Sequence, residues 1–325
     1  MLSLSVAFWD YDRTMPLADG RVAIEGCAPA FSILPPQETF VRALRDAEFD
    51  VCELSLSRYA QSVARGDNQY IAIPVYPSRA FRHAGLYVRA DRGIRDAAGL
   101  KGRRVGLHNF DDTAAVFVRG MLRDEYGIGV SGINWVSARL TGGGTAPIVP
   151  ASLAPAVKLE LGPERATLDS LLLDGAIDGL FSLLPPASFR ARNPLVRRLH
   201  DDYRAAEEDY FRRTGIFPIM HVVAVRRSLT AANPWLAGSL YDAFARAKEC
   251  AMANLDVLQA SKVTLPWVVS DLQRTQDVMG ADYWPYGVKA NRAVLTAALR
   301  YLAEEGLLAR SLSVDDLFVP SLVER

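Results

Sequence analysis

The sequence ALRDAEFD at residues 43–50 decides the fold, because LLLDGAID at residues 171–178 repeats its pattern later in the chain. Asp46 aligns with Asp174, and Asp50 aligns with Asp178. Each copy predicts the end of a helix, a turn through a small residue and the start of a strand. Chance similarity between two common turns is the alternative explanation. The repeat favours an α/β protein of two lobes with the same βαβ order, which binds a small anion in a central cleft.

The remaining sequence supplies the elements that two such lobes need. Apolar alternation predicts strands at 2–9, 49–54 and 222–225, and residues 100–107 predict a tight turn that leads into a short buried strand. Helices are predicted at 36–47, 113–127, 234–253, 266–278 and 292–305, with Asp111 or Asp112 as a cap of the second helix. Glycine and proline predict an irregular loop at 141–155. We expect the first lobe to comprise 1–88 and 219–325, with the C-terminal helices, and the second lobe to comprise 89–218.

Composition limits the function to classes that act on small molecules. Half of the 325 residues are apolar, and Lys plus Arg balance Asp plus Glu at 37 each, so the net charge recruits neither nucleic acid nor an anionic membrane. Three widely spaced cysteines predict reduced thiols rather than disulfides or a metal cluster. The first ten residues lack the basic region of a secretory signal, which predicts a cytoplasmic protein. No apolar run is long enough to predict a membrane span.

Two segments combine arginine with histidine. Residues 76–83, YPSRAFRH, place Arg79, Arg82 and His83 beside Ser78. Arginine forks bind carboxylates, and imidazole exchanges protons near neutral pH, although a hinge loop with salt bridges is the alternative. His221 follows Arg212 and Arg213 in the second segment, where a core histidine bonded to backbone is nearly as good an explanation. His200 lies in a charged run and is predicted to be a surface residue, and His108 alone is weak evidence.

Hydroxyl groups at predicted strand ends suggest further anion contacts. Ser55, Ser57 and Arg58 follow the strand at 49–54 and precede a helix, an arrangement that suits an anion. Asp112 and Thr113 are in the equivalent place of the second lobe, although a carboxylate there repels an anionic ligand. The usual motifs of dinucleotide, nucleoside triphosphate, zinc-protease and serine-hydrolase sites are absent.

Several long segments resemble 4,5-dihydroxyphthalate decarboxylases. These segments are YDRT at 11–14, GC at 26–27, FDVCELSLS at 49–57, PSRAFRH at 77–83, YFRRTGIFPIMH at 210–221 and WPYG at 284–287. The resemblance spans nearly the whole chain and implies a type II periplasmic-binding-protein fold adapted to catalysis. The segment at 108–115 departs from the expected pattern, which leaves open whether the substrate is 4,5-dihydroxyphthalate or a related aromatic acid.

The resemblance and the Arg/His segments together predict a decarboxylase that protonates the ring carbon bearing the carboxyl group. His83 is the first candidate for the proton donor and His221 the second. Candidate substrate contacts are Arg13, Tyr11, Ser55, Ser57, Ser78, Arg79, Arg82, Thr113 and Phe217, with Phe81 as a further ring contact. No organic cofactor is expected. A divalent metal ion is left open, with His83, His221, Asp10 and Glu53 as candidate ligands.

Two other classes of protein are weighed against the enzyme. The first is a solute-binding protein or sensor for an aromatic or sulfonate-like anion, since this fold does not specify function. The second is an interaction protein, for which the clustered C-terminal helices are the only support; they also leave a homo-oligomer open. The partner expected of the chain remains a small aromatic carboxylate.

Overall fold

The alternating strands and helices form two separate mixed β-sheets in the computed structural model, which describes all 325 residues. Each sheet belongs to its own structural unit. Unit 1 contains Met1–Arg79, Thr214–Thr296 and Leu312–Arg325, and unit 2 contains Ala80–Arg213 and Ala297–Ser311. No helix combines the length and apolar character that crossing a membrane requires.

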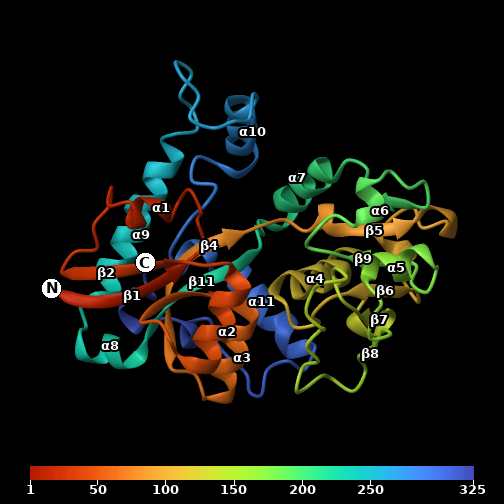
Figure 1. Cartoon of the computed structure of the whole chain (residues 1–325), viewed down its shortest axis with the longest axis horizontal. Coiled ribbons are helices and arrows are strands. Elements are labelled where there is room, and N and C mark those ends of the chain that lie inside the picture. The colour runs from red at the N-terminus through yellow and green to blue at the C-terminus, as the bar shows by residue number, and fades with distance from the viewer. The chain divides into compact units, whose positions relative to one another are not determined.

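The unit 1 sheet has five strands in the order β2-β1-β3-β11-β4 (Figure 1). The strands are β1 (Leu2–Phe8), β2 (Cys27–Ile33), β3 (Val51–Ser55), β4 (Tyr70–Arg79) and β11 (Ile219–Arg226). β1 is parallel to β2 and β3, whereas β11 is antiparallel to β3 and β4. The chain leaves β1 for β2 on one side and returns to β3 on the other. The carboxyl ends of β1 and β3 therefore form a switch point, where open α/β sheets bind ligands.

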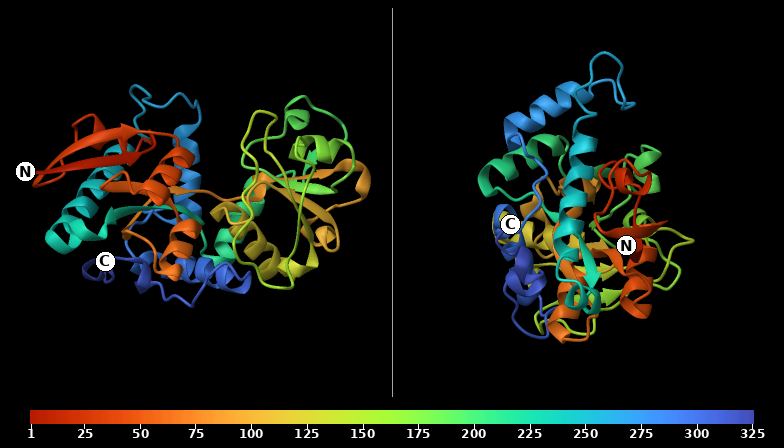
Figure 2. Two further views of the ribbon diagram at one scale, coloured as in Figure 1. Left: turned by 60° about the horizontal axis from the view of Figure 1, so that its bottom comes forward. Right: turned by 90° about the vertical axis from the view of Figure 1, so that its left-hand side faces the viewer.

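Helices cover this sheet. They are α1 (Met15–Ala18), α2 (Pro36–Asp46), α3 (Leu56–Arg65), α8 (Arg227–Ala232), α9 (Leu236–Met252), α10 (Val268–Met279) and the start of α11 (Arg292–Glu304). α2 and α3 pack against β3, and α9 packs against β4. α10 contains no buried residue, and the right-hand view of Figure 2 shows it, in blue, at the periphery of unit 1.

The unit 2 sheet has six strands in the order β10-β5-β9-β6-β7-β8. The strands are β5 (Leu86–Arg89), β6 (Arg104–Leu107), β7 (Asn134–Ser137), β8 (Lys158–Leu161), β9 (Gly179–Phe181) and β10 (Val196–Arg198). The helices are α4 (Thr113–Tyr126), α5 (Leu168–Leu173), α6 (Ala187–Arg190) and α7 (Tyr203–Thr214). Residues 141–157 lack regular structure, as the glycine and proline content predicts.

The two sheets share one arrangement of strands. β1 has a parallel neighbour on each side, β2 and β3, and β6 has the parallel neighbours β7 and β9. Beyond β3, the sheet of unit 1 continues with β11 and then β4, each antiparallel to the strand before it. Beyond β9, the sheet of unit 2 continues in the same way with β5 and then β10. β8 extends the second sheet beyond this common set.

The segments 43–50 and 171–178 adopt the same local structure. Asp50 donates its backbone N–H to Ser5, and its carboxylate accepts the N–H of Ser5 at 2.8 Å. Asp178 makes the same pair of contacts with Arg104, with a carboxylate distance of 3.1 Å. Each aspartate therefore joins its strand to the central parallel strand of its sheet.

One backbone position in these segments is left-handed in both units. Ala47 has φ 47° and Gly175 has φ 74°. Glycine adopts this conformation without steric cost, whereas alanine places its Cβ close to the following carbonyl oxygen. Unit 1 therefore carries backbone strain that unit 2 avoids.

The unit boundaries differ from those expected from the sequence. β5 starts before the expected boundary after residue 88, yet it pairs with β9 and β10 of the second sheet, and unit 2 begins at Ala80. The second boundary falls at Arg213 rather than after residue 218. Residues 297–311 belong to unit 2, where Glu305 forms a buried ion pair with Arg119.

We predict that Ala47→Gly stabilises the protein by about 0.5–1 kcal/mol, because it removes the left-handed strain at a helix end. Gly175→Ala should destabilise the protein by about 1–2 kcal/mol for the opposite reason. Urea unfolding followed by circular dichroism measures both changes. Ala205→Gly at an exposed position within α7 is the control and should cost about 1 kcal/mol. A loss of stability in Ala47→Gly equal to that of the control contradicts the prediction.

Candidate functional site

A fully buried carboxylate lies at the switch point of unit 1. Glu53 is in the middle of β3 and is 0% exposed. Its Oε2 accepts the backbone N–H of Trp9 at 3.2 Å, at the end of β1, and its Oε1 accepts the hydroxyl of Tyr11 at 2.8 Å. A buried carboxylate requires such donors, because burial removes the water that would solvate its charge.

His221 is the third partner of Glu53. Its Nδ1 lies 2.5 Å from Glu53 Oε1. The two residues are diagonal neighbours, because β11 pairs His221 with Ser55 and Val223 with Glu53. Irregular register against β4 on both sides of His221 changes the local course of β11, as bulges beside functional sites often do. Since Glu53 accepts at Oε1, Nδ1 carries the proton of this contact, and Nε2 is the ring atom left for a ligand.

Tyr11 extends this cluster. Its hydroxyl oxygen lies 3.4 Å from His221 Nδ1, and its side chain also shares a hydrogen bond with Ser78. Burial and the Glu53 charge raise the pKa of Tyr11 far above its ordinary value. The phenol therefore stays protonated and donates a hydrogen bond to Glu53. The cluster therefore joins the ends of β1, β3, β11 and β4 in one hydrogen-bonded network.

Arg13 stacks between two aromatic rings beside the cluster. Its guanidinium carbon lies 4.4 Å from the Tyr11 ring centre and 4.3 Å from that of Trp284. Nε donates to the carbonyl of Pro77 at 2.6 Å, and Nη1 pairs with Asp12 at 2.9 Å. The side chain remains 17% exposed, and Nη2 makes no hydrogen bond within the protein. Arg13 is thus a fixed cation with a donor available to an anionic ligand.

Arg79, in contrast, is committed to the protein. It is 6% exposed, and its amino groups donate to Asn291 and to the carbonyls of Pro285 and Phe217. Burial lowers the pKa of Arg79 to about 10. This geometry gives Arg79 a role in holding the segments that contain Phe217 and Pro285, and substrate contact by Arg79 stays an untested prediction.

The other unit 1 candidates lie around the same strand ends. Ser55 ends β3 opposite His221, Ser57 is buried in the first turn of α3, and Phe217 packs edge-on against Trp284 with ring centres 5.3 Å apart. Of the candidate metal ligands, Glu53 and His221 are together, whereas Asp10 is exposed. No group of three His, Cys, Asp or Glu side chains is arranged to hold a metal ion.

His83 is in unit 2, in a buried titratable cluster of a different kind. His83 is 4% exposed. Its Nδ1 is buried without a hydrogen-bond partner and lies 3.9 Å from Glu207 Oε1. The ring of His200 lies 5.4 Å from that of His83. Burial, together with the charges of His200 and Arg213, lowers the pKa of His83 to about 4. His83 is therefore neutral at pH 7.

The prediction that His200 is a surface residue is wrong. It is only partly exposed, its Nε2 is buried, and burial lowers its pKa. Glu207, which the sequence analysis did not single out, accepts the backbone N–H of Ala84 at 3.3 Å. Burial raises the pKa of Glu207 to about 7. A charged helix sequence such as YRAAEEDYFRRT contains no signal for which of its acids is buried.

The remaining unit 2 candidates lie nearby in the chain. Arg82 is partly buried, and this desolvation lowers its pKa to about 10, whereas the negative charges of Glu207 and Asp112 act to raise it. Thr113 is the buried first residue of α4, and Asp112 precedes it at the N-cap position, where its carboxylate accepts from Asn109 at 3.2 Å. His108 Nδ1 contacts the backbone oxygen of Ala138 at 3.0 Å, which accounts for this histidine without a ligand.

Comparison with known proteins identifies the family. No protein-family model matches the chain. The 4,5-dihydroxyphthalate decarboxylase of Comamonas testosteroni is 42% identical over 323 residues, which cover 99% of this chain and 98% of that protein. The chain belongs to the 4,5-dihydroxyphthalate decarboxylase family. The Pseudomonas putida protein of the same name is 41% identical over 211 residues, 65% of this chain and 82% of its own length.

The fold is confirmed by a solved structure outside the 4,5-dihydroxyphthalate decarboxylase family. The periplasmic aliphatic sulphonate binding protein SsuA from Escherichia coli superimposes with a TM-score of 0.54 over 98% of this chain and 92% of that protein, at 14% identity. The predicted type II periplasmic-binding-protein-like α/β fold and the resemblance to the decarboxylase family are both correct.

We predict that Glu207→Gln stabilises this decarboxylase-family protein at pH 8. The pKa of Glu207 in the folded protein is about 7, above its ordinary value of 4.5. The free energy of unfolding of the wild type is therefore highest below pH 4.5, where Glu207 is protonated, and falls as the pH rises through 7. Glutamine keeps the acceptor for Ala84 and avoids the buried charge. The expected gain is on the order of 2–3 kcal/mol at pH 8 and disappears near pH 4.5.

Urea unfolding of the wild type and the Glu207→Gln variant between pH 4.5 and 8 measures this dependence. Glu164→Gln at an exposed position is the matched control and should leave the pH profile unchanged. A Glu207→Gln gain that is the same at every pH contradicts the buried-charge explanation.

Proposed function

We propose that this protein catalyses the non-oxidative decarboxylation of 4,5-dihydroxyphthalate or a closely related hydroxylated aromatic dicarboxylate. Membership of the 4,5-dihydroxyphthalate decarboxylase family supports the reaction class. The observation that carries the assignment of the chemistry is the contact between Glu53 and His221 at the switch point of unit 1. The partly exposed His221 ring and the Arg13 cation give this site a proton donor and a carboxylate ligand.

The reaction requires one proton and no change of oxidation state. His221 Nε2–H protonates the ring carbon that bears the leaving carboxylate, assisted by electron donation from the hydroxyl group para to it. The carbon–carboxylate bond then breaks, its electron pair restores the aromatic ring, and CO2 leaves. The products are CO2 and 3,4-dihydroxybenzoate, and solvent returns the consumed proton to His221.

His221 fits the role of donor better than His83. A general acid must be protonated when the substrate binds, and His83 has a pKa lowered to about 4 by burial. His83 Nδ1 also lies in the protein interior without a partner. His221 remains 18% exposed and is oriented by a fixed carboxylate, which is the arrangement of histidines that transfer protons in other enzymes.

Arg13 supports the choice of a dicarboxylate. Decarboxylation removes one carboxylate, so a second must hold the ring in place while the first departs. Arg13 is fixed by Tyr11, Trp284 and Pro77 and retains an unpaired amino group, which suits that second carboxylate. The same stacked rings supply an apolar surface for the substrate ring.

The alternative from the sequence analysis, a solute-binding protein or sensor, is disfavoured. Its support is the fold shared with the sulphonate binding protein at 14% identity, and a fold does not specify activity. The decarboxylase relative is 42% identical over nearly the whole chain. A binding protein also has no need of a buried glutamate that orients a histidine.

We predict that His221→Ala lowers the rate of CO2 release from 4,5-dihydroxyphthalate by at least about 100-fold, because a general acid contributes about that much. Substrate binding, measured by calorimetry, should persist because Arg13 is unchanged. His83→Ala is the comparison and should retain most of the activity. Loss of CO2 release in His83→Ala, with full activity in His221→Ala, would assign the donor to His83.

We also predict that Glu53→Gln lowers kcat by at least about 100-fold with little change in KM, because the amide no longer fixes His221 with its proton on Nδ1. Tyr11→Phe removes a hydrogen bond from the same oxygen but leaves the His221 contact, so its loss should be much smaller. Unfolding curves of both variants check that the fold is intact. Equal effects of the two variants on kcat would show that Glu53 does not act through His221.

A further inference from the structure

The loop at residues 284–287, with the sequence WPYG, brings Trp284 to Arg13 in unit 1. These residues form neither helix nor strand, so the regular hydrogen bonds of such elements do not fix their course. The carbonyl of Trp284 accepts Lys248 Nζ at 3.0 Å, and the indole N–H of Trp284 donates to the carbonyl of Tyr76 at 2.9 Å. The position of Trp284 therefore depends on donors and acceptors outside the loop.

Asn291 holds two carbonyls of this loop at once. It ends the short 3-10 helix η5 (Lys289–Asn291) and is 1% exposed. Its Nδ2 donates to the carbonyl of Pro285 at 3.0 Å and to that of Gly287 at 2.8 Å, and its Oδ1 accepts the guanidinium of Arg79. An amide turned the other way would face two acceptors with its oxygen and a cation with its donor. The partners therefore determine the orientation of the amide.

Two side chains of β4 hold the same two carbonyls. Arg79 Nη2 donates to the carbonyl of Pro285 at 3.0 Å, and the hydroxyl of Tyr76 donates to that of Gly287 at 3.2 Å. Each of the two carbonyls thus accepts two donors, one of which belongs to Asn291. Asn291, Arg79 and Tyr76 together form a loop clamp. Such a satisfied buried network is rigid, because each lost bond leaves a buried group without a partner.

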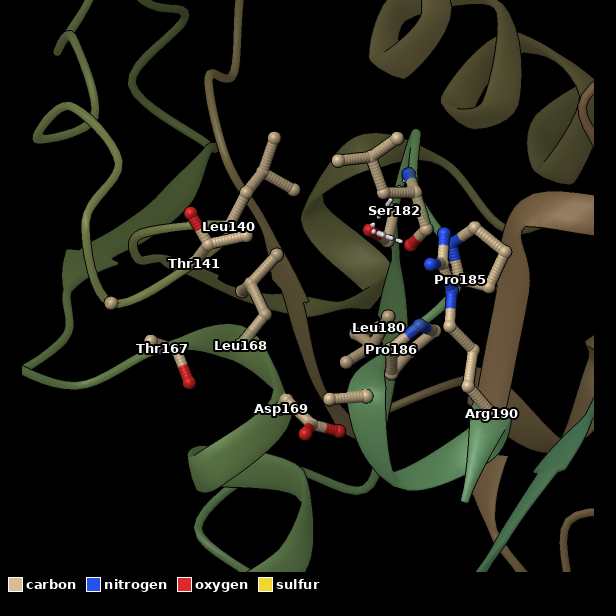
Figure 3. Close-up of a pocket in the computed structure, with 13 residues that line it drawn as sticks. Leu140, Thr141, Thr167, Leu168, Asp169, Leu180, Ser182, Pro185, Pro186 and Arg190 are labelled. Atoms are coloured by element: carbon tan, nitrogen blue, oxygen red, sulfur yellow. Dashed lines mark hydrogen bonds between the residues drawn. The ribbon is translucent and has the colours of Figure 1, made fainter. Parts of the chain in front are cut away.

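Unit 2 shows a simpler way to fix a loop. The hydroxyl of Ser182, just after β9, donates to the carbonyl of Leu184 at 2.6 Å within the same loop (Figure 3). That contact shapes the loop but does not tie it to another element. The loop clamp, in contrast, joins residues 284–287 to β4 and η5, so it places the loop relative to the unit 1 sheet.

The loop clamp reaches the candidate site through one ring. Trp284 directly precedes the held segment and packs edge-on against Phe217, with ring centres 5.3 Å apart. The Trp284 ring centre also lies 4.3 Å from the guanidinium carbon of Arg13, so displacement of the loop moves the face on which Arg13 stacks. The hydrogen bonds between Glu53 and its partners, His221 included, do not involve this loop.

We propose that Asn291 is a positioning residue that sets the affinity for the substrate through Trp284 and Arg13. Asn291 is buried and acts only through these two residues. The inference rests on the proposed function, in which Arg13 holds the carboxylate that the substrate retains. Because Glu53 orients the proton donor separately, loss of the clamp raises KM and leaves kcat nearly unchanged.

Asn291→Asp tests this role. The carboxylate keeps an acceptor for Arg79 and pairs with its charge, but it loses both donors and faces the carbonyls of Pro285 and Gly287 with an oxygen. KM for 4,5-dihydroxyphthalate should rise at least about tenfold, with kcat changed less than about twofold. Gln273→Glu makes the same amide-to-acid change at an exposed position of α10 and is the matched control, with both constants unchanged.

Tyr76→Phe is a milder variant that keeps the buried ring and removes a single donor from the clamp. KM should rise by about two- to threefold, because Asn291 still holds the carbonyl of Gly287. This variant decides the inference if Asn291→Asp does not fold, and an unchanged KM in folded Tyr76→Phe then overturns it.

A double-mutant cycle with Arg13→Ala shows the route of the effect. Arg13→Ala alone should raise KM, and Asn291→Asp added to it should raise KM further by less than about twofold. A full effect of Asn291→Asp in both backgrounds overturns the inference, because Asn291 would then act independently of Arg13.

A spectroscopic signal of Trp284 separates positioning from a general loss of stability. The chain has five tryptophans, so labelling with 5-fluorotryptophan gives five fluorine NMR signals, and Trp284→Phe assigns one of them. Asn291→Asp should shift or broaden the Trp284 signal alone. An unmoved Trp284 signal overturns the inference even when KM changes.

Phthalate, which lacks the hydroxyl groups of the substrate, separates this inference from the proposed reaction. Its dissociation constant, measured by calorimetry, should follow the same pattern across the variants as KM does. A wild type that shows this pattern but releases no CO2 from 4,5-dihydroxyphthalate contradicts the proposed reaction alone. Normal CO2 release with an unchanged KM in Asn291→Asp contradicts the inference alone.

Discussion

The burial of the Glu53 carboxylate is the constraint on which the unit 1 site depends. A charge in the middle of a strand with no exposure is costly, and water cannot reach it to offset that cost. The strand ends around it must therefore supply donors, which are the N–H of Trp9, the hydroxyl of Tyr11 and the ring of His221. The need of Glu53 for these donors fixes both the loop after β1 and the orientation of His221. The buried charge of Glu53 therefore defines the geometry available for proton transfer.

Repetition of the strand order gives each unit the same edge but leaves the chemistry of that edge free to differ. Unit 1 buries an anion beside a partly exposed histidine, and every oxygen of that anion has a donor. In unit 2, burial disfavours the charged forms of His83 and Glu207, which lowers the pKa of the histidine and raises that of the glutamate. The two clusters thus differ in kind: the first orients a proton donor, whereas the second minimises buried charge in a packed interior.

The sequence predicted much of the fold because the determining signals are local. The left-handed turns at Ala47 and Gly175 and the aspartates that follow them are visible in eight residues each. The contact of Glu53 with His221 could not be predicted in this way, because it depends on the register of β11 against a strand far away in the chain. The signal that was available is a lone acid within the apolar strand sequence VCELS, which indicates a buried charge in need of a partner. His200 shows the opposite error, since a charged run such as RRLHDD gives no information on which side chain turns inward.

A fold used to bind solutes needs few changes to support decarboxylation, because the reaction consumes a single proton and requires no redox step. Binding alone is satisfied by cations such as Arg13 and by aromatic walls such as Trp284. Catalysis adds the demand that a donor be held at one ring carbon, and an imidazole on a strand meets it only if its other nitrogen is fixed. The irregular register around His221 and the carboxylate at its Nδ1 meet that demand within the existing sheet. The step from binding to catalysis at this edge therefore rests on one buried acid and one reoriented histidine rather than on a new architecture.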